Sequence, residues 1–323
     1  AAYELIVKGG RVIDPSRMLD ETADIAVADG KIAAVGPNLR SDVATIVDAK
    51  GKLVVPGLID IHTHAAEATG GPEKLPLDGV TGWIDAGSCG ADNLAAGIEG
   101  CRNAQKPFGL LLNIGRKGVI SEGDTKNLAL ADVDAAKAAI AAHRDIIVGV
   151  KARLSANVTG PNDVEVLKRA QAVASSFNLP VMIHMGQSFS PLPALIGQLK
   201  KGDIVTHMFA PPPNAIIDDK GKILPEVMAA RQRGVWFDVG NGLGGHIRWD
   251  TVEAILKAGF WPDSISTDWH LTSKNSGVVD MANCMSKYFG FGMTVPQAIA
   301  MGTTNPARMI PIFKDREIGR AHV

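Results

Sequence analysis

The sequence predicts an α/β protein in which a closed (β/α)8 barrel, the TIM-barrel fold, follows a small β module. After residue 55, short apolar runs typical of strands alternate with stretches of helical character. Eight such runs can be counted, which is the number of parallel strands that closes this barrel. Before residue 56 the apolar runs are separated by tight turns and show no helical period.

Residues 1–55 form the expected β module. Residues 4–7, 11–13, 24–28 and 31–35 are apolar or alternate between apolar and polar, as strands do. Asp29-Gly30 separates the last two runs and is a strong signal for a two-residue hairpin. We therefore expect short strands joined by tight turns.

Residues 56–312 form the expected barrel, and residues 313–323 a tail. The strand candidates are 57–62, 79–85, 109–113, 146–151, 181–184, 203–207, 235–239 and 264–268. Helical stretches follow at 131–143, 163–177 and 250–258, of which the first carries Asp132 and Asp134 in its first turn. A last helix is expected to open at Thr294 as its N-cap, with Pro296 in the first turn.

Side chains that bind metals or move protons close several of these runs. His62 and His64 are two positions apart, so in a strand they point to the same side, spaced to hold one metal ion. Residues of similar chemistry end four later runs: Lys151, His184, His207 and Asp268. Because the active site of such a barrel lies at the carboxyl ends of its strands, we expect these residues to share one site.

The composition is that of an ordinary globular protein, with 323 residues, 46% hydrophobic and 21% charged, and a formal net charge of −1. The chain has no long run of like charges, so the sequence gives no electrostatic signal for binding nucleic acid or anionic membranes. No apolar stretch approaches the roughly 20 residues that span a bilayer, and the N-terminus does not read as a signal peptide. Three cysteines without a C-x-x-C pair fit a reducing compartment, so we expect a cytoplasmic protein.

Five motifs resemble those of the amidohydrolase superfamily, in particular the dihydroorotase-like amidohydrolase/deacetylase metallohydrolases. They are PGLIDIHTH at 56–64, DAGS at 85–88, GVKAR at 149–153, FDVG at 237–240 and STDWH at 266–270. The resemblance covers almost the whole chain and implies a TIM barrel with a β-sandwich module that C-terminal strands normally complete. Those strands are missing here, so we expect a full-length relative to continue. A truncated chain and an altered tail, which would include His322, are both open.

The resemblance implies two divalent metal ions. His62, His64 and Asp268 would hold the more buried ion, and His184 and His207 the more exposed one. Imidazole and carboxylate suit Zn²⁺ and similar ions, so zinc is expected, with manganese, cobalt and iron open. Two metals about 3.5–4 Å apart need an anion between them, which an ammonium group cannot provide. The family's solution is a carbamate formed from CO2 and the lysine amine, so carbamylated Lys151 is expected to bridge the ions together with a hydroxide.

The implied reaction is a metal-dependent hydrolysis. The hydroxide attacks a carbonyl that the exposed metal polarises, and Asp268 takes the proton. Asp268 then protonates the leaving amine or alkoxide, so it is ligand, base and acid in turn. We expect a binuclear, deacetylase-like hydrolase of acyl amide or ester bonds that acts on small N-acyl or O-acyl acids, with Asp268 and Lys151 as its catalytic residues.

Further residues near strand ends are candidate substrate contacts. Arg153 lies two positions beyond Lys151, and two readings of it are open: a clamp on a substrate carboxylate, or a salt bridge at the barrel rim. Other strand-end candidates for the pocket are Asn113, Asn241, Trp269 and His270. His246 follows a glycine-rich stretch and is either a loop residue or a substrate contact.

Four other functions are weighed against this one. A mononuclear deaminase of the same barrel would carry Glu where this chain has Gln187, and would leave Lys151 without a role. A cyclic amidase such as dihydroorotase would usually carry Arg where Ala66 stands. A catalytically silent scaffold typically loses metal ligands, and none is lost here. A redox or nucleotide-binding protein has no supporting motif, since residues 240–245 lack the G-x-G-x-x-G pattern. The cyclic amidase and the silent scaffold remain the alternatives. As binding partner we expect a small-molecule acyl substrate, and a homo-oligomer is left open.

Overall fold

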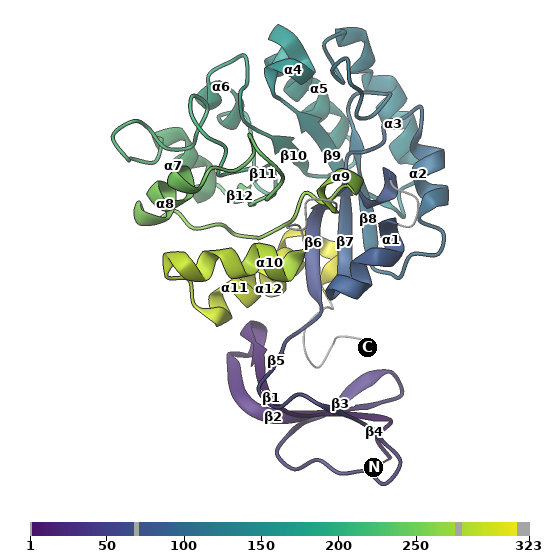
Figure 1. The fold of residues 1–323 in the computed structure, drawn as a ribbon. Coiled ribbons are helices and arrows are strands. Elements are labelled where there is room, and N and C mark those ends of the chain that lie inside the picture. Colours follow the sequence, from purple (N-terminus) through teal and green to yellow (C-terminus); the bar gives the residue numbers. More distant parts are fainter. Residues whose placement is uncertain (1, 68–70, 275–279, 315–323) are drawn as a thin grey trace.

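A computed structural model describes residues 2–67, 71–274 and 280–314, and its strands form two sheets (Figure 1). The first is a five-stranded sheet built from the first part of the chain, and the second is a seven-stranded parallel sheet. Helices cover the outer face of the parallel sheet, as in a (β/α)8 barrel (Figure 1). The predicted fold class is therefore confirmed.

The N-terminal sheet contains β1 (Leu5–Asp14), β2 (Leu19–Ala28), β3 (Lys31–Gly36), β4 (Thr45–Asp48) and β5 (Leu53–Val54). Its order is β3-β2-β1-β4, and β5 pairs with another part of β1. The hairpin predicted at Asp29-Gly30 is confirmed, with φ of 52° and 67° at the two residues. The runs 4–7 and 11–13 were expected as separate strands, but they belong to the single strand β1. Gly9, at a φ of 73°, lets the chain bulge there without ending the pairing with β2.

The barrel strands are β6 (Leu58–Thr63), β7 (Val80–Ala86), β8 (Phe108–Asn113), β9 (Ile147–Arg153), β10 (Val181–His184), β11 (Ile204–Thr206) and β12 (Trp236–Phe237). They pair in parallel and in chain order, from β6 to β12. Seven of the eight predicted strands are thus present at the predicted places. We keep the division of the chain between residues 55 and 56 as a proposal.

The eighth predicted strand, 264–268, is not a regular strand, although it closes the barrel. On one side, the amides of Val239 and Asn241 donate to the carbonyls of Ser264 and Ser266, at 3.0 and 2.9 Å. On the other side, the amide of Asp268 donates to the carbonyl of His62 at 2.8 Å. Asp268 has a φ of 56°, in the left-handed region, which breaks the repeat that a strand requires. The prediction of a regular strand at 264–268 was therefore wrong, but the segment does occupy the predicted eighth position in the barrel.

The four helices expected from the sequence are α3 (Val133–Ala142), α5 (Asp163–Ser175), α8 (Trp249–Lys257) and α11 (Val295–Gly302). Thr294 caps α11 as predicted, in a capping box with Gln297. The other α-helices are α1 (Gly71–Lys74), α2 (Leu94–Gly100), α4 (Ala156–Thr159), α6 (Leu192–Ile196), α7 (Pro225–Gln232), α9 (Leu271–Lys274), α10 (Met281–Ser286) and α12 (Thr304–Met309). Short 3-10 turns are η1 (Pro15–Arg17), η2 (Ala65–Glu67), η3 (Leu75–Asp78), η4 (Leu128–Leu130), η5 (Gly160–Asn162), η6 (Lys287–Phe291) and η7 (Pro311–Phe313).

The end of the described chain plugs the barrel where its strands begin. Phe313 is buried in a cluster with side chains of several strands, and it leaves no room for a side chain at Gly82, near the start of β7. Ile312 approaches Gly109, near the start of β8, in the same way. The boundary that we drew between residues 312 and 313 passes through this plug, so Phe313 belongs to the barrel core. Residues 315–323, including His322, lie outside the described part of the chain.

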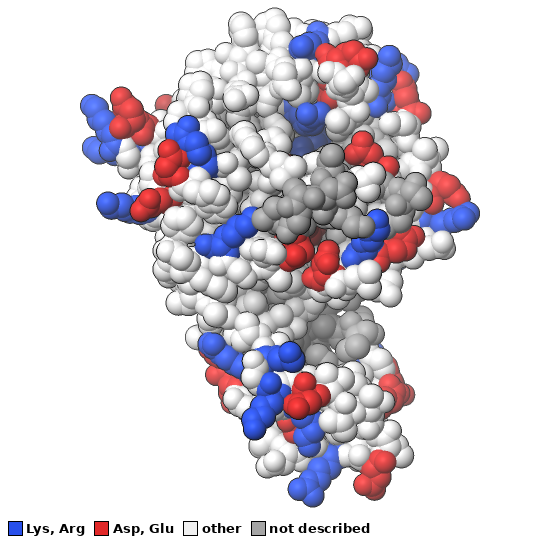
Figure 2. Space-filling model, in the orientation of Figure 1, with Lys and Arg blue, Asp and Glu red and all other residues white. Residues whose placement is uncertain are grey.

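The five-stranded sheet lies at this same end of the barrel, away from the carboxyl ends of the strands (Figure 1). Only residues 55–57 separate β5 from β6, and α11 packs against β1 and η1. On the face that Figure 2 shows, basic and acidic side chains are interspersed, with no large area of one sign. None of the helices in the described residues combines the length and apolar character needed to cross a bilayer.

We predict that Thr267→Val destabilises the protein by about 1–3 kcal/mol, because it removes a donor from a buried carboxylate. The Thr267 hydroxyl donates to Asp60 Oδ2 at 2.6 Å, and Asp60 is fully buried. Urea unfolding of the metal-free protein would measure the change. Thr45→Val, at an exposed position of β4, is the control and should stay within about 0.5 kcal/mol. An equally small effect at Thr267 would contradict the prediction.

Candidate metal centre

The predicted ligand residues converge at the carboxyl ends of the barrel strands. A cavity of about 510 Å³ opens there. It is lined by His62, His64, Glu67, Val119, Lys151, Arg153, His184, His246, Asp268, His270 and Leu271. One predicted ligand, His207, is not part of the cavity lining. It is buried and stacks on His246, which does line the cavity. The structure therefore brings together all six residues that the strand-end argument selected.

The first group of possible metal ligands is His62, His64 and Asp268, whose ligand atoms all lie within 4.8 Å of one another. Asp268 Oδ1 is 3.1 Å from His62 Nε2 and 3.4 Å from His64 Nε2. The two histidines come from β6 and the loop after it, and the aspartate from the irregular closing segment. Two neutral imidazoles and one carboxylate suit a divalent ion such as Zn²⁺.

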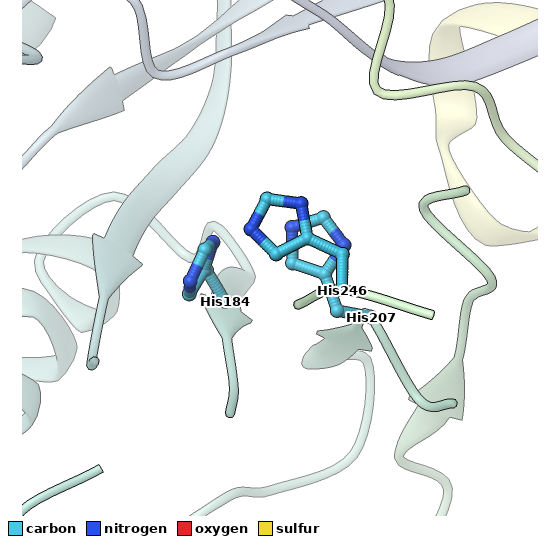
Figure 3. Close-up of side chains that lie close together, drawn as sticks. All are labelled: His184, His207 and His246. Carbon is cyan, nitrogen blue, oxygen red and sulfur yellow. The ribbon is translucent and has the colours of Figure 1, made fainter. Parts of the chain in front are cut away.

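The second group is His184, His207 and His246 (Figure 3). The ring of His246 stacks on that of His207, with centroids 3.9 Å apart. The ring of His184 faces both edge-on, at 85° to His207 and 89° to His246. The sequence left open whether His246 is a loop residue or a substrate contact, and the structure places its ring inside the site.

Hydroxyl groups orient the two histidines of the first group. His62 Nδ1 lies 2.8 Å from Thr206 Oγ1, and that hydroxyl donates its proton to Asp238 Oδ2 at 2.7 Å. A hydroxyl has one proton to donate, so Thr206 must accept from the Nδ1–H of His62. The Nε2 lone pair of His62 is thereby left for a metal ion.

His64 is held in the same way. Its Nδ1 lies 2.7 Å from Ser88 Oγ, which donates to Asp85 Oδ2 at 2.8 Å. Ser88 therefore accepts from Nδ1–H, and Nε2 faces Asp268 with a free lone pair. The sequence motif DAGS contained both Asp85 and Ser88, but only the folded chain shows that they orient a ligand.

His184, at the end of β10, and His207, directly after β11, also have one ring nitrogen held by a hydrogen bond. His207 Nδ1 donates to the carbonyl of Gly240 at 2.7 Å. His184 Nε2 lies 2.7 Å from the hydroxyl of Ser155, which leaves Nδ1 as its ligand atom. Gly240 has a φ of 51°, and a Cβ there would stand 2.3 Å from Thr206 Oγ1. This glycine is therefore required for the close packing behind two ligands.

Burial favours the neutral form of three of these imidazoles, which is the form that binds metals. It lowers the pKa of His62 to about 3, and it lowers the pKa of His184 and His207 well below the usual value. Burial alone would raise the pKa of Asp268, but its interactions with His62, His246 and His64 outweigh burial and hold that pKa well below the usual range. The site thus offers uncharged nitrogens and an ionised carboxylate.

Lys151 lies on β9 beside the first group and is almost completely buried. Its Nζ is 3.3 Å from His62 Nε2 and donates to the carbonyl of Ala86 at 3.1 Å. Burial lowers the pKa of Lys151 to about 8, so a substantial neutral fraction of its amine exists near neutrality. Gly87, at a φ of 84°, has no room for a Cβ, which would stand 2.5 Å from Lys151 Cβ and Cγ.

Arg153 makes the salt bridge that was one of the two open readings, and it also lines the cavity. Its Nη1 lies 3.1 and 3.3 Å from the two carboxylate oxygens of Asp124, so it makes the rim salt bridge. The same side chain also lines the cavity and is one-fifth exposed. Asp124 accepts in addition from Asn113 Nδ2 and from the amide of Ile120. This carboxylate therefore fixes Arg153 at the cavity wall while other N–H groups of the guanidinium stay available.

The other candidate contacts divide into two kinds. His270 lines the cavity, as expected. Asn113 and Asn241 are buried and do not line it. Asn113 spends its amide on Gly87 and Asp124, and Asn241 bonds Lys287 and the backbone of Gly242. Both asparagines support residues around the site. A position at a strand end does not by itself distinguish a supporting residue from one that touches a substrate. Trp269 is buried.

Sequence reasoning gave no role to several polar residues behind the ligands: Asp85, Ser88, Asp124, Ser155, Thr206 and Asp238. All except Asp124 stand within two positions of the end of a barrel strand, which is the signal that could have drawn attention to them; Asp124 lies in the long loop after β8. Glu67, Val119 and Leu271 line the cavity from loops, where no strand pattern points to them.

Comparison with known proteins assigns the chain to a family. The model of the Amidohydrolase family matches residues 53–315, so the chain belongs to this family. A deacetylase of Enterococcus faecalis is 30% identical over 94% of this chain and 84% of its own length. A deacetylase of Brucella anthropi is 31% identical over 93% of this chain and 77% of its own. A dihydroorotase of Solibacter usitatus is 30% identical over 56% of this chain and 41% of its own.

Solved structures agree with the fold. A structure described as a dihydroorotase covers 98% of this chain and 86% of its own, with a TM-score of 0.87 and 28% identity. One described as an adenine deaminase covers 98% and 87%, with a TM-score of 0.86 and 29% identity. The protein is thus a hydrolytic enzyme of the amidohydrolase superfamily that acts on C–N bonds. The family is generally metal-dependent, and the two groups of ligands described above could hold metal ions.

Proposed function

We propose that this enzyme is a binuclear metal-dependent hydrolase that removes acyl groups from small N-acyl or O-acyl acids. The observation that carries the proposal is the position of Asp268 between the two ligand groups, with Lys151 beside His62. Asp268 Oδ1 faces His62 and His64, whereas Oδ2 is 3.9 Å from His207 Nε2. Lys151 reaches the same place from β9. Two groups that share Asp268 fit one binuclear centre better than two separate sites.

The donor set fits two divalent ions, with zinc as the expected metal. His62, His64 and Asp268 would hold one ion, and His184 and His207 the other. When bound, such ions acidify a water so that it is a nucleophile near neutral pH, and they polarise the carbonyl of the substrate. The fit is supported by the outer hydrogen bonds of the four histidines, which leave one lone pair on each ring for a metal.

Lys151 would contribute a carbamate. Its neutral amine, available because burial lowers its pKa to about 8, can add to CO2 with loss of a proton, which gives an anionic group with two oxygens. An ammonium group so close to His62 Nε2 would instead oppose a cation. Gly87 supports this role, since any side chain there would displace Lys151.

Asp268 would hold and move the proton. It is buried and ionised, and it lies at the centre of the site. We propose that it takes the proton from the attacking water and delivers it to the leaving nitrogen or oxygen. The left-handed backbone at Asp268 is a local strain that the surrounding hydrogen bonds maintain, as is common at active sites.

Arg153 would bind the carboxylate of the substrate. A planar guanidinium held at the cavity wall by Asp124 can bind a second carboxylate through its remaining N–H groups. Ala66 stands where a cyclic amidase would usually carry an arginine, so an acid held by Arg153 would approach the metals differently. Similarity over most of the chain to proteins named deacetylases also supports the proposal of an acylated substrate. The second candidate is a cyclic amidase, which the similarity to a dihydroorotase structure favours.

A hydrolysis screen tests the proposed function. The zinc-loaded enzyme would be assayed with N-acetyl amino acids, O-acetyl hydroxy acids, hydantoins, dihydroorotate and adenine. We predict measurable kcat/KM on at least one acetylated acid and far weaker action on the cyclic compounds. Asp268→Asn should be folded yet reduced by about 10²–10⁴-fold, because an amide cannot carry the proton. Efficient turnover of dihydroorotate with none across the acetylated panel would favour the cyclic amidase.

We predict that Lys151→Ala loses metal and activity together, and that short carboxylic acids partly restore both by supplying an anion. Metal content by elemental analysis and turnover on the best substrate would measure this. In wild-type apoprotein, reconstitution with zinc and bicarbonate should be faster at a pH of about 8.5 than at about 6.5, because a lysine with a lowered pKa is mostly neutral only at the higher pH. An unmodified lysine in a well-resolved, metal-loaded site would contradict the proposed carbamylation.

We predict that Arg153→Lys raises KM for acidic substrates and affects neutral acyl substrates much less, because a point charge does not reproduce the planar fork. Steady-state kinetics on an acyl-amino acid and its amide would compare the two. Arg116→Lys is the matched control, since Arg116 pairs with Asp92 and Asp132 outside the cavity lining. Equal effects on both substrates would give Arg153 a structural role only.

A further inference from the structure

His246 is a fifth imidazole at the site, and it differs from the other four in how it is held. His62, His64, His184 and His207 each have one ring nitrogen engaged by a hydroxyl or a carbonyl. Among the described residues, no such partner holds His246. Its Nδ1 is shielded from solvent and makes no well-aligned hydrogen bond there, although Asp268 Oδ2 lies 3.3 Å away. Histidines that bind metals almost always have the other ring nitrogen fixed.

The loop that carries His246 is packed closely against its ring. Gly242, at a φ of 58°, is so close that a Cβ there would stand 2.5 Å from His246 Nδ1 and 2.9 Å from Asp268 Oδ2. The ring stacks on His207 and stands edge-on to His184, the two residues proposed to hold the exposed ion (Figure 3). It is therefore packed against the ligands on one side.

The other side of His246 faces open space. One-third of its side chain is exposed, and it lines the 510 Å³ cavity. It also lines a neighbouring cavity of about 120 Å³, which shares Arg153 and His184 with the larger one. A substrate whose carboxylate reaches Arg153 and whose carbonyl lies beside His184 and His207 would pass directly along this ring.

We propose that His246 is a catalytic residue that donates a ring N–H to the oxygen of the reacting carbonyl, rather than a resident metal ligand. The proposal rests on the proposed acyl hydrolysis. Because Nδ1 is enclosed beside Asp268, the donor is the Nε2–H of the neutral ring, and this proton stays on the ring throughout. Negative charge develops on this oxygen as water adds to the carbonyl, so the hydrogen bond is stronger in the transition state than in the bound substrate.

The test compares His246→Leu, which has similar bulk and no donor, with His246→Gln, which keeps an N–H near the position of Nε2. Loss of one such donor lowers kcat by about 10²–10³-fold, with little change in KM. We expect that loss in the Leu variant and a recovery of at least about tenfold in the Gln variant. His143→Gln, at the end of α3 outside the cavity lining, is the control and should match wild type.

Two readouts do not depend on turnover. Zinc content and the visible spectrum of the cobalt-substituted protein should be unchanged in both His246 variants. Calorimetry should show weaker binding of a methylphosphonate analogue of the best substrate, whose tetrahedral phosphorus mimics the adduct, by about 10²-fold in the Leu variant. Binding of acetate should change by less than about threefold, since this product lacks the tetrahedral centre.

The outcomes separate the two proposals. Loss of metal or an altered cobalt spectrum in the His246 variants would make His246 a ligand and overturn this inference. Unchanged kcat and phosphonate affinity in His246→Leu, with an active wild type, would overturn it as well. A wild type that holds metal but hydrolyses no acylated acid would instead contradict the proposed function, and the inference would fall with it.

Discussion

Two buried carboxylates, Asp60 and Asp238, hold the segment that closes the barrel, and the geometry of the site depends on them. Asp60 accepts from the hydroxyl and amide of Thr267, and Asp238 accepts from the hydroxyls of Ser264, Ser266 and Thr206. Burial raises the pKa of Asp60 to about 7 and that of Asp238 to about 6, and the hydrogen bonds from these donors act in the opposite direction by favouring the charged form. With these bonds in place, the irregular segment 264–268 is pinned on both flanks. Its last residue, Asp268, is thereby brought to His62.

The same bonds connect the closing of the barrel to the chemistry of the ligands. Thr206 gives its proton to Asp238 and must accept from His62, so the carboxylate that holds the closing segment also sets the tautomer of a ligand on β6. Ser88 and Asp85 repeat the arrangement for His64. Asp238 therefore serves two purposes, since it accepts hydrogen bonds from the closing segment and also fixes the orientation of one imidazole through Thr206.

The residues proposed to touch a substrate are held differently. Arg153 is fixed by Asp124, a residue of the loop after β8, and His246 comes from the glycine-rich loop after β12. Relatives that are similar over most of the chain include deacetylases, and the similar solved structures include a dihydroorotase and an adenine deaminase. The metal chemistry suits any polarised carbonyl or similar centre, so selectivity must come from such loop-borne contacts. In this chain they place a cation and an imidazole on one wall of the cavity.

The sequence by itself determined the fold class and the six residues that meet at the centre of the site. Strand and helix periods are local, and the rule that parallel strands present their carboxyl ends at one rim converts strand ends into neighbours. The tertiary structure alone decided that residues 264–268 close the barrel irregularly, that Asn113 and Asn241 support the site from outside the cavity lining, and that His246 lies inside it. Those outcomes depend on contacts between distant residues: Asp60 and Thr267 are 207 positions apart, and no local pattern encodes which donor a buried carboxylate will find.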